Sequence, residues 1–215
     1  MLANKNVICT GEDSEGTPVF TQDGNQRARG AWSYTILDGH KRPALQGEAV
    51  MTATQAREAA SAGPVAVRSA SSPCGYEVQG QFQPSDPAIA TYYDDYGFCS
   101  DDAGLDFLGA GGARHSSAKG RATGMRQAGR LSVSYYDLLG NPVQQSGYNQ
   151  YGYVDHVLTA YNFDQTPRAV ERRHSRSESQ SVTEAYAYSY DALGRETKVT
   201  HSINGGAART ISQSE

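Results

Sequence analysis

The chain has 215 residues and a formal net charge of -4, and it contains no continuous apolar stretch of about 18 residues. This length allows one domain or two small ones, and the lack of an apolar stretch predicts no membrane span. The acidic balance gives no reason to expect a nucleic acid or an anionic membrane as partner. Tyrosine is unusually frequent, with 14 Tyr against 5 Phe and 1 Trp. A Tyr ring packs on a sheet while its hydroxyl reaches water or a backbone group, so this balance favours strands with one partly wet face.

Up to residue 98 the sequence predicts a degenerate β segment with one short helix. Met1 to Asn6 precede no apolar run of signal-peptide length, so the chain is expected to carry no export signal of its own. Strand-like alternation occurs at 17–21 and 31–36, and Asp23-Gly24-Asn25 between them predicts a turn.

The helix is expected near residues 53–62. Thr52 and Gln55 have the spacing of a capping box, and Gly63-Pro64 is a normal stop. The small Ala-rich face favours a crossover packed on the sheet over an interaction helix, which is the alternative.

Cysteine and histidine spacings give no support for a metal site. No CxxC, HExxH or helical His pair occurs, so the thiols are expected to be free, with one disulfide as the alternative in a secreted protein. No phosphate loop and no GxSxG phrase is present either, and we therefore expect no cofactor, no catalytic residue and no enzyme activity. The residues concerned are Cys9, Cys74, Cys99, His40, His115, His156, His174 and His201.

Residues 99–126 are rich in Gly, Ala, Ser and Asp without any period, which predicts a long surface loop or a partly disordered insertion. Five carboxylates gather in and just before this stretch. These carboxylates could bind Ca²⁺, but the EF-hand spacing is absent, so a solvated acidic loop is the preferred interpretation. The five are Asp94, Asp95, Asp101, Asp102 and Asp106.

Residues 127–215 predict a second β segment, the most regular part of the chain, organised around the phrase Tyr-Asp-x-x-Gly between two strands. Worn copies occur at 37–43 and 161–165, and the Asp or Asn positions 94, 137, 162 and 191 follow at intervals of 43, 25 and 29 residues. Such recurrence indicates an internal repeat. The residues of the two full matches and of the near match at Tyr93 are Tyr93, Asp94, Gly97, Tyr136, Asp137, Gly140, Tyr190, Asp191, Gly194 and Arg195.

Each residue type of the phrase suits a turn. Tyr ends a strand, Asp accepts backbone N–H groups, Gly adopts a left-handed conformation, and Arg reaches back to a carboxylate. We therefore interpret the Asp and Arg residues as structural.

On these motifs the chain resembles RHS/YD-repeat proteins, and residues 19–27 and 204–206 are similar to stretches of the large RHS-repeat proteins of Bacteroides-like bacteria. The resemblance implies a mainly β fold in which repetitive antiparallel hairpins form part of a spiral shell. It also implies a non-enzymatic scaffold that encloses a C-terminal toxin or effector, in a secreted or cell-surface parent. The partners would be the rest of that shell and its cargo. The family's shell-closing core, with its aspartate-dependent cleavage site, has no match here, and no effector follows Glu215, so we expect a fragment of a longer protein.

The alternative function is a cell-surface adhesion or carbohydrate-binding module, with a glycan or protein as partner and Tyr92, Tyr148, Tyr151 and Tyr153 exposed. A glycosidase or autoprotease is a weaker alternative, because the sequence fixes no pair of converging acids. A basic run is expected at a hairpin tip, with an RNA or anionic-glycan contact as the less favoured interpretation. It comprises Arg168, Arg172, Arg173, His174 and Arg176.

Overall fold

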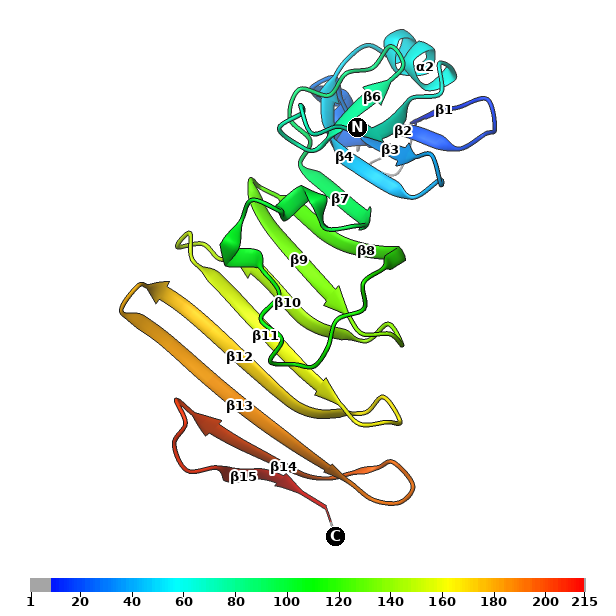
Figure 1. Ribbon diagram of the computed structural model, residues 1–215. Coiled ribbons are helices and arrows are strands. Elements are labelled where there is room, and N and C mark those ends of the chain that lie inside the picture. The colour runs from blue at the N-terminus through cyan, green and yellow to red at the C-terminus, as the bar shows by residue number, and fades with distance from the viewer. Residues whose placement is uncertain (1–8, 215) are drawn as a thin grey trace, which may run out of the picture. The chain divides into compact units, whose positions relative to one another are not determined.

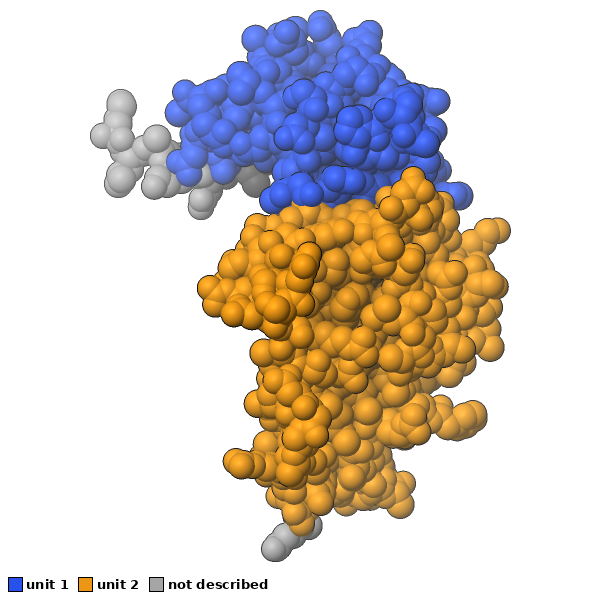
Figure 2. All heavy atoms as spheres, turned by 60° about the vertical axis from the view of Figure 1, so that its left-hand side comes forward, with its two compact units in different colours: residues 1–92, 125–129 blue, residues 93–124, 130–215 orange. Residues whose placement is uncertain are grey.

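The computed structural model describes residues 9–214, within which strands dominate. Two compact units emerge: residues 1–92 with 125–129, and residues 93–124 with 130–215 (Figure 2). Residues 99–124 belong to the second unit, and residues 125 and 126 belong to the first. The expectation about Met1 to Asn6 lies outside the described residues, as does the side chain of Cys9.

The first unit is built on antiparallel neighbours with one parallel addition (Figure 1). The antiparallel order is β1 (Cys9–Glu12), β2 (Pro18–Gln22), β3 (Ala31–Asp38), β4 (Pro43–Val50) and β7 (Ile89–Asp94), the last of which begins in this unit. β5 (Val65–Arg68) lies parallel to β3 and pairs antiparallel with β6 (Tyr76–Gln79). The alternation at 31–36 therefore forms the central strand, and its Tyr34 ring meets Phe82 in the core.

Helix α2 (Ala53–Ser61) makes the crossover from β4 to β5, and Thr52 caps it through a capping box with Gln55. Ala56 is fully buried, and its carbonyl lies so close to Gly11 of β1 that a Cβ there would sit 3.1 Å from the oxygen. The small face of the helix thus lets it approach the sheet closely.

A second helix, α1 (Gly24–Ala28), stands where a simple turn was expected. Asp23 caps it through its own capping box, and Gln26 also bonds Ser33 and Glu48. Residues that favour a turn also favour a helix N-terminus, as Asp23 does here by capping α1. The hydrogen bonds of the buried Gln26 amide stabilise the helix over a simple turn.

In the second unit the strands follow one another in sequence order, each antiparallel to the next (Figure 1). They are β8 (Ala118–Gln127, whose last three residues belong to the first unit), β9 (Arg130–Tyr136), β10 (Pro142–Tyr148), β11 (Val154–Tyr161), β12 (Pro167–Ser177), β13 (Gln180–Tyr190), β14 (Glu196–Ile203) and β15 (Arg209–Gln213). The expected fold of repetitive antiparallel hairpins is confirmed.

The segment before β8 covers one face of β9 to β11, with the 3₁₀ helices η1 (Gly97–Cys99) and η2 (Ala103–Leu105) lying over these strands (Figure 1). Leu105 is fully buried, and its carbonyl accepts the hydroxyl of Tyr135 at 3.0 Å. The buried amide of Gln144 bonds the backbone of the segment at Asp106 and Leu108.

The expectation of a surface loop at 99–126 is therefore wrong. The segment packs through a few apolar residues and through hydrogen bonds from its backbone to the buried amide of Gln144. Its sequence therefore shows no hydrophobic period. Residues 118–127 form β8 despite a Gly-, Lys- and Arg-rich sequence, because pairing with neighbouring strands outweighs weak β propensity.

β12 to β15 have no such cover. Between residues 167 and 213, Val199 is the one buried side chain that the structure describes.

Within residues 9–214 no helix is long and apolar enough to cross a membrane, and Cys74 and Cys99 are both free thiols.

Candidate functional site: a repeated turn and a neighbouring pocket

The turn that begins at Asp191 shows how the repeated phrase is built. The Asp191 N–H donates to the Arg195 carbonyl at 2.9 Å, and Gly194 N–H donates back to the Asp191 carbonyl at 3.0 Å. The side-chain Oδ1 accepts the N–H groups of Leu193 and Arg195, each at 2.9 Å. Oδ2 receives the Arg195 guanidinium, at 2.7 Å from both Nε and Nη2. Both oxygens of the carboxylate are therefore used within the turn.

The same five-residue turn occurs six times in residues 9–214. In each, the first N–H donates to the fifth carbonyl at 2.8 to 3.0 Å, and the fourth N–H donates to the first carbonyl. In the hairpins of β1–β2, β3–β4, β9–β10 and β11–β12, as in that of β13–β14, the residue before the turn pairs with the residue after it, next to a register shift. The first residues of the six turns are Asp13, Asp38, Asp137, Asn149, Asn162 and Asp191.

The fourth position of every turn has positive φ. Gly fills it in four turns, whereas Lys41 and Gln165 adopt φ 63° and 68° in the two worn copies. The turn geometry therefore persists where the glycine has been lost, at a cost of about 1 kcal/mol for a left-handed non-glycine residue.

Sequence inspection missed the turns at Asp13 and Asn149. The available signal was the weaker pattern Asp/Asn-x-x-Gly, visible as Asp13 with Gly16 and as Asn149 with Gly152.

The copy at Tyr93 departs from the pattern, so its interpretation as the same turn needs correction. Asp94 itself has φ 72° and accepts the Gly120 N–H at 2.6 Å, while Gly97 begins η1. The segment after Asp94 crosses over the face of β9 to β11, and a tight hairpin at this point would return the chain directly into an adjacent strand instead.

The turns at Asp137, Asn162 and Asp191 share a further contact through the Tyr that precedes each of them. The Tyr161 hydroxyl donates to the Pro142 carbonyl at 3.2 Å, and the Tyr190 hydroxyl donates to the Pro167 carbonyl at 2.8 Å. Pro142 and Pro167 directly follow the turns that begin at Asp137 and Asn162. The hydroxyl of Tyr136 makes the corresponding bond to Ala122 at 2.6 Å. Each of these three copies is therefore fastened to the strand before it, whereas the Tyr148 hydroxyl before the Asn149 turn bonds Asp102.

Hydrogen bonding stabilises the ionised turn carboxylates. In Asp191 the N–H and then the guanidinium of Arg195 lower the pKa below its usual 3.8. In Asp137 burial is the largest influence and raises the pKa, but the bonds from Asn141 and from backbone N–H groups outweigh it and leave the pKa below 3.8. The pKa values of Asp13 and Asp38 are lowered too. These are the properties of turn-building acids.

The basic run does not act as one patch, because β12 alternates its side chains between the two faces of the sheet. Arg173 pairs with Glu171 on one face, whereas the Arg172 guanidinium lies 5.4 Å from the Tyr186 ring centroid on the other. His174 and Arg176 instead line an open pocket of about 710 Å³.

The pocket also contains one of the four tyrosines expected at the surface. Tyr151 is 52% exposed, while Tyr92 is 1% exposed and the Tyr148 hydroxyl bonds Asp102 at 2.8 Å. The expectation of an exposed ring is wrong for Tyr92, which is buried; Tyr148 and Tyr153 are both half-buried.

Among the described residues, no three His, Cys, Asp or Glu side chains form a group that could hold a metal ion. Members of the acidic cluster cap local backbone instead: Asp95 accepts the Gly97 N–H, and Asp102 accepts the Gly104 N–H. His156 is part-buried beside Ser146, and burial followed by the nearby Arg173 lowers its pKa. His201 stacks on Tyr186, with ring centroids 4.6 Å apart.

Comparison with known proteins finds no matching family model and no matching curated sequence. A similar solved structure is a chain in the crystal structure of TcdB2-TccC3-Cdc42, which aligns with a TM-score of 0.45 and 13% identity over 92% of this chain. The present chain spans 9% of the length of that protein. A likeness at this level does not assign a family.

Proposed function

We propose that the chain is a non-enzymatic scaffold segment that extends a β-sheet shell of the RHS/YD-repeat type in a longer, exported or cell-surface protein. The enclosed partner would be a toxin or effector. The observation that carries the proposal is the recurrence of one turn with one hydrogen-bond pattern. Before three of these turns, the hydroxyls of Tyr136, Tyr161 and Tyr190 each bond a carbonyl of the preceding strand. An arrangement in which a hairpin is fastened to the strand before it by the same Tyr bond suits growth by addition of further copies.

The roles of the charged motif residues support a structural function. The carboxylate of Asp191 is bonded by its own turn and by Arg195, and Asp38 pairs with Arg42 in the same way at 2.7 Å. Groups engaged in such turns have little capacity left to act on a substrate.

The test exploits the outer strand β15. A scaffold segment should associate with itself through exposed strand edges, because an edge strand is a template for another strand. Ile211 on β15 and Ile203 on β14 are similarly exposed, at 57% and 51%. By sedimentation velocity, Ile211→Lys should weaken self-association at least tenfold, whereas the matched variant Ile203→Lys on an inner strand should change it less than twofold.

A chain that stays monomeric at about 100 µM, the upper end of ordinary solution work, would count against the scaffold role. So would an equal loss in the two variants. Circular dichroism should show a β-rich signal in both, and a mostly helical spectrum would contradict the proposal directly.

A binding module is the second candidate, and the pocket beside Tyr151 is the observation that favours it. Loss of glycan-array signal on Tyr151→Ala, with Tyr153→Ala as the comparison, would support a glycan-binding role independently of self-association.

A further inference from the structure

The pocket at Tyr151 is assembled from three separate stretches of the second unit. Arg130 comes from the start of β9, Asn149 and Tyr151 from the β10–β11 turn, and Arg176 and Gln180 from either side of the β12–β13 connection. Its volume of about 710 Å³ is that of a small-ligand site, which typically falls between about 300 and 1,000 Å³.

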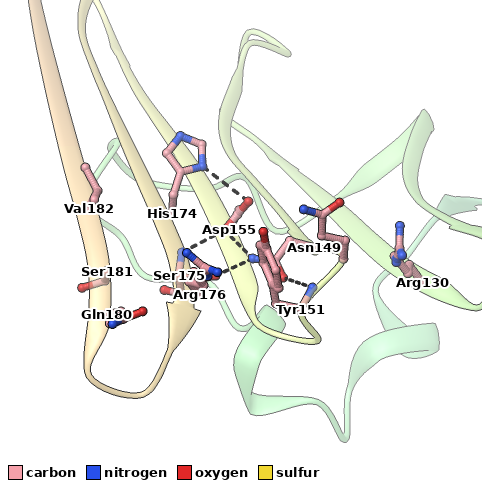
Figure 3. Close-up of a pocket in the computed structure, with 11 residues that line it drawn as sticks. Arg130, Asn149, Tyr151, Asp155, His174, Ser175, Arg176, Gln180, Ser181 and Val182 are labelled. Atoms are coloured by element: carbon pink, nitrogen blue, oxygen red, sulfur yellow. Dashed lines mark hydrogen bonds and ion pairs between the residues drawn. The ribbon is translucent and has the colours of Figure 1, made fainter.

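A hydrogen-bonded network forms one wall of the pocket (Figure 3). Asp155 Oδ1 accepts Asn149 Nδ2 at 2.9 Å and the Ser175 N–H at 3.0 Å, while His174 Nδ1 lies 3.4 Å from Oδ2. Asn149 Nδ2 also donates to the Ser175 carbonyl at 2.6 Å, and Asn149 Oδ1 holds the Tyr151 N–H at 2.9 Å. The turn and the neighbouring strand β12 are thereby fixed to each other, so the pocket is preorganised.

Two arginines in this pocket lack an acidic partner. Within residues 9–214, neither Arg130 nor Arg176 has a carboxylate at ion-pair distance, whereas Arg173 and Arg195 both do. The Arg176 guanidinium lies 5.4 Å from the Tyr151 ring centroid, which holds it beside the pocket, and Figure 3 shows Tyr151 between Arg176 and Arg130 in that view. The carboxylate of Asp155 is already bonded by Asn149, Ser175 and His174. The charged groups of the lining that remain available to a ligand are therefore the two guanidinium groups, which are positive.

The remaining lining suits a ligand rich in hydroxyl groups. Tyr151 offers a half-exposed ring, Val182 is 44% exposed, and the exposed Gln150, Gln180 and Ser181 offer side-chain donors and acceptors. Guanidinium groups bind carboxylates through paired hydrogen bonds. We propose that this pocket binds an acidic saccharide, with carboxylates of the saccharide held by Arg130 and by Arg176 and a sugar ring against Tyr151.

A saccharide fits better than an acidic peptide, because a peptide needs backbone partners. β12 lies between β11 and β13, and the Ser175 backbone facing the pocket is occupied by Asp155 and Asn149. The described lining therefore offers side chains and no free strand edge. A nucleic acid is disfavoured by the single stacking ring and by the chain's net charge of -4. This proposal rests on the second candidate function, glycan binding at Tyr151, and specifies an acidic saccharide as the ligand. It does not depend on the scaffold role.

The experiment is isothermal titration of the full chain with trigalacturonic acid. Maltotriose serves as the neutral sugar of equal length, and triglutamate as the peptide of similar charge. Arg130→Met and Arg176→Met remove the two proposed carboxylate ligands. Arg168→Met is the matched control, because Arg168 is also exposed on β12 but lies outside the lining. All three side chains are exposed, and unchanged melting temperatures verify that the variants fold.

We expect trigalacturonic acid to bind at least tenfold more tightly than either comparison ligand. Arg130→Met and Arg176→Met should each weaken that binding at least tenfold, and Arg168→Met less than twofold. Absence of binding at 10 mM trigalacturonic acid, about the weakest affinity such a pocket could use, would overturn the proposal. Equal binding of triglutamate, or equal losses in the three variants, would do so as well.

Discussion

Two stretches of the second unit use the same hairpins with different support. β9 to β11 carry a buried face, with Val133, Tyr135, Gln144 and Leu158 each 3% exposed or less, under the segment that contains Leu105. β12 to β15 repeat the antiparallel pairing, yet Val199 is their one buried side chain among the residues described. Regular strand pairing and turn chemistry therefore continue where the hydrophobic core has ended, which is possible because β11 provides a template for β12.

The comparison predicts where the largest stabilisation lies. Leu105→Ala should lower the free energy of unfolding by about 3 kcal/mol, because it leaves a cavity between the covering segment and β9 to β11. Urea denaturation measures the loss, and hydrogen exchange should localise faster exchange to these strands. Leu193, 78% exposed in the β13–β14 turn, is the matched control, and Leu193→Ala should cost less than about 0.5 kcal/mol. Equal costs would mean that the covering segment adds no core.

A smaller effect is expected at the left-handed glycines of the two stretches. Gly140 in the β9–β10 turn and Gly194 in the β13–β14 turn have φ 93° and 77°. Gly194→Ala should cost about 1 kcal/mol for the backbone alone, since its Cβ would meet nothing within 4 Å. Gly140→Ala should cost about 2 kcal/mol, because its Cβ would also displace the Arg121 guanidinium from the Tyr136 ring. Thermal denaturation of the two variants gives the difference, and a larger loss in Gly194→Ala would reverse the argument.

The smallest effect concerns the turn carboxylate and its pH dependence. Asp137→Ala should cost about 1 kcal/mol at pH 7, because it leaves the Asn141 N–H without its carboxylate acceptor. Asp137→Asn should cost less, because Asn149 accepts the same bonds from Tyr151 and Tyr153 in its own turn.

The sign of the pH effect follows from the lowered pKa of Asp137. Its contribution to stability is complete above the unfolded value of 3.8 and is lost as the pH falls below 3.8 through the folded pKa. Urea midpoints between pH 5 and pH 2.5 should therefore fall less steeply for Asp137→Asn than for the parent chain. Parallel curves would show that the charge of Asp137 contributes nothing.

Much of the architecture could be predicted from local patterns. Period-two alternation around Tyr190 and the Asp-x-x-Gly spacing indicate strand, turn and strand, because both depend on residues within one hairpin. The capping box at Thr52 likewise located α2 to within one residue of its end.

Three features depended on distant partners and could not be predicted in this way. The packing of the segment around Leu105 on β9 to β11 depends on its hydrogen bonds with Gln144 and Tyr135, which lie 30 or more residues away in the chain. The lack of a hairpin at Tyr93 reflects Asp94 bonding Gly120, 26 residues further along the chain. The pocket joins Arg130 to Arg176 across three hairpins, whereas the sequence showed only a basic run whose members the strand divides between two faces.

The sequence by itself determined the repeating unit, because strand alternation and turn hydrogen bonds are made by residues a few positions apart. The tertiary structure alone decided which copies are covered, how Tyr161 and Tyr190 fasten one copy to the next, and which side chains line the pocket. Those contacts join residues about 20 to 45 positions apart, at separations set by strand pairing, and no local pattern encodes them.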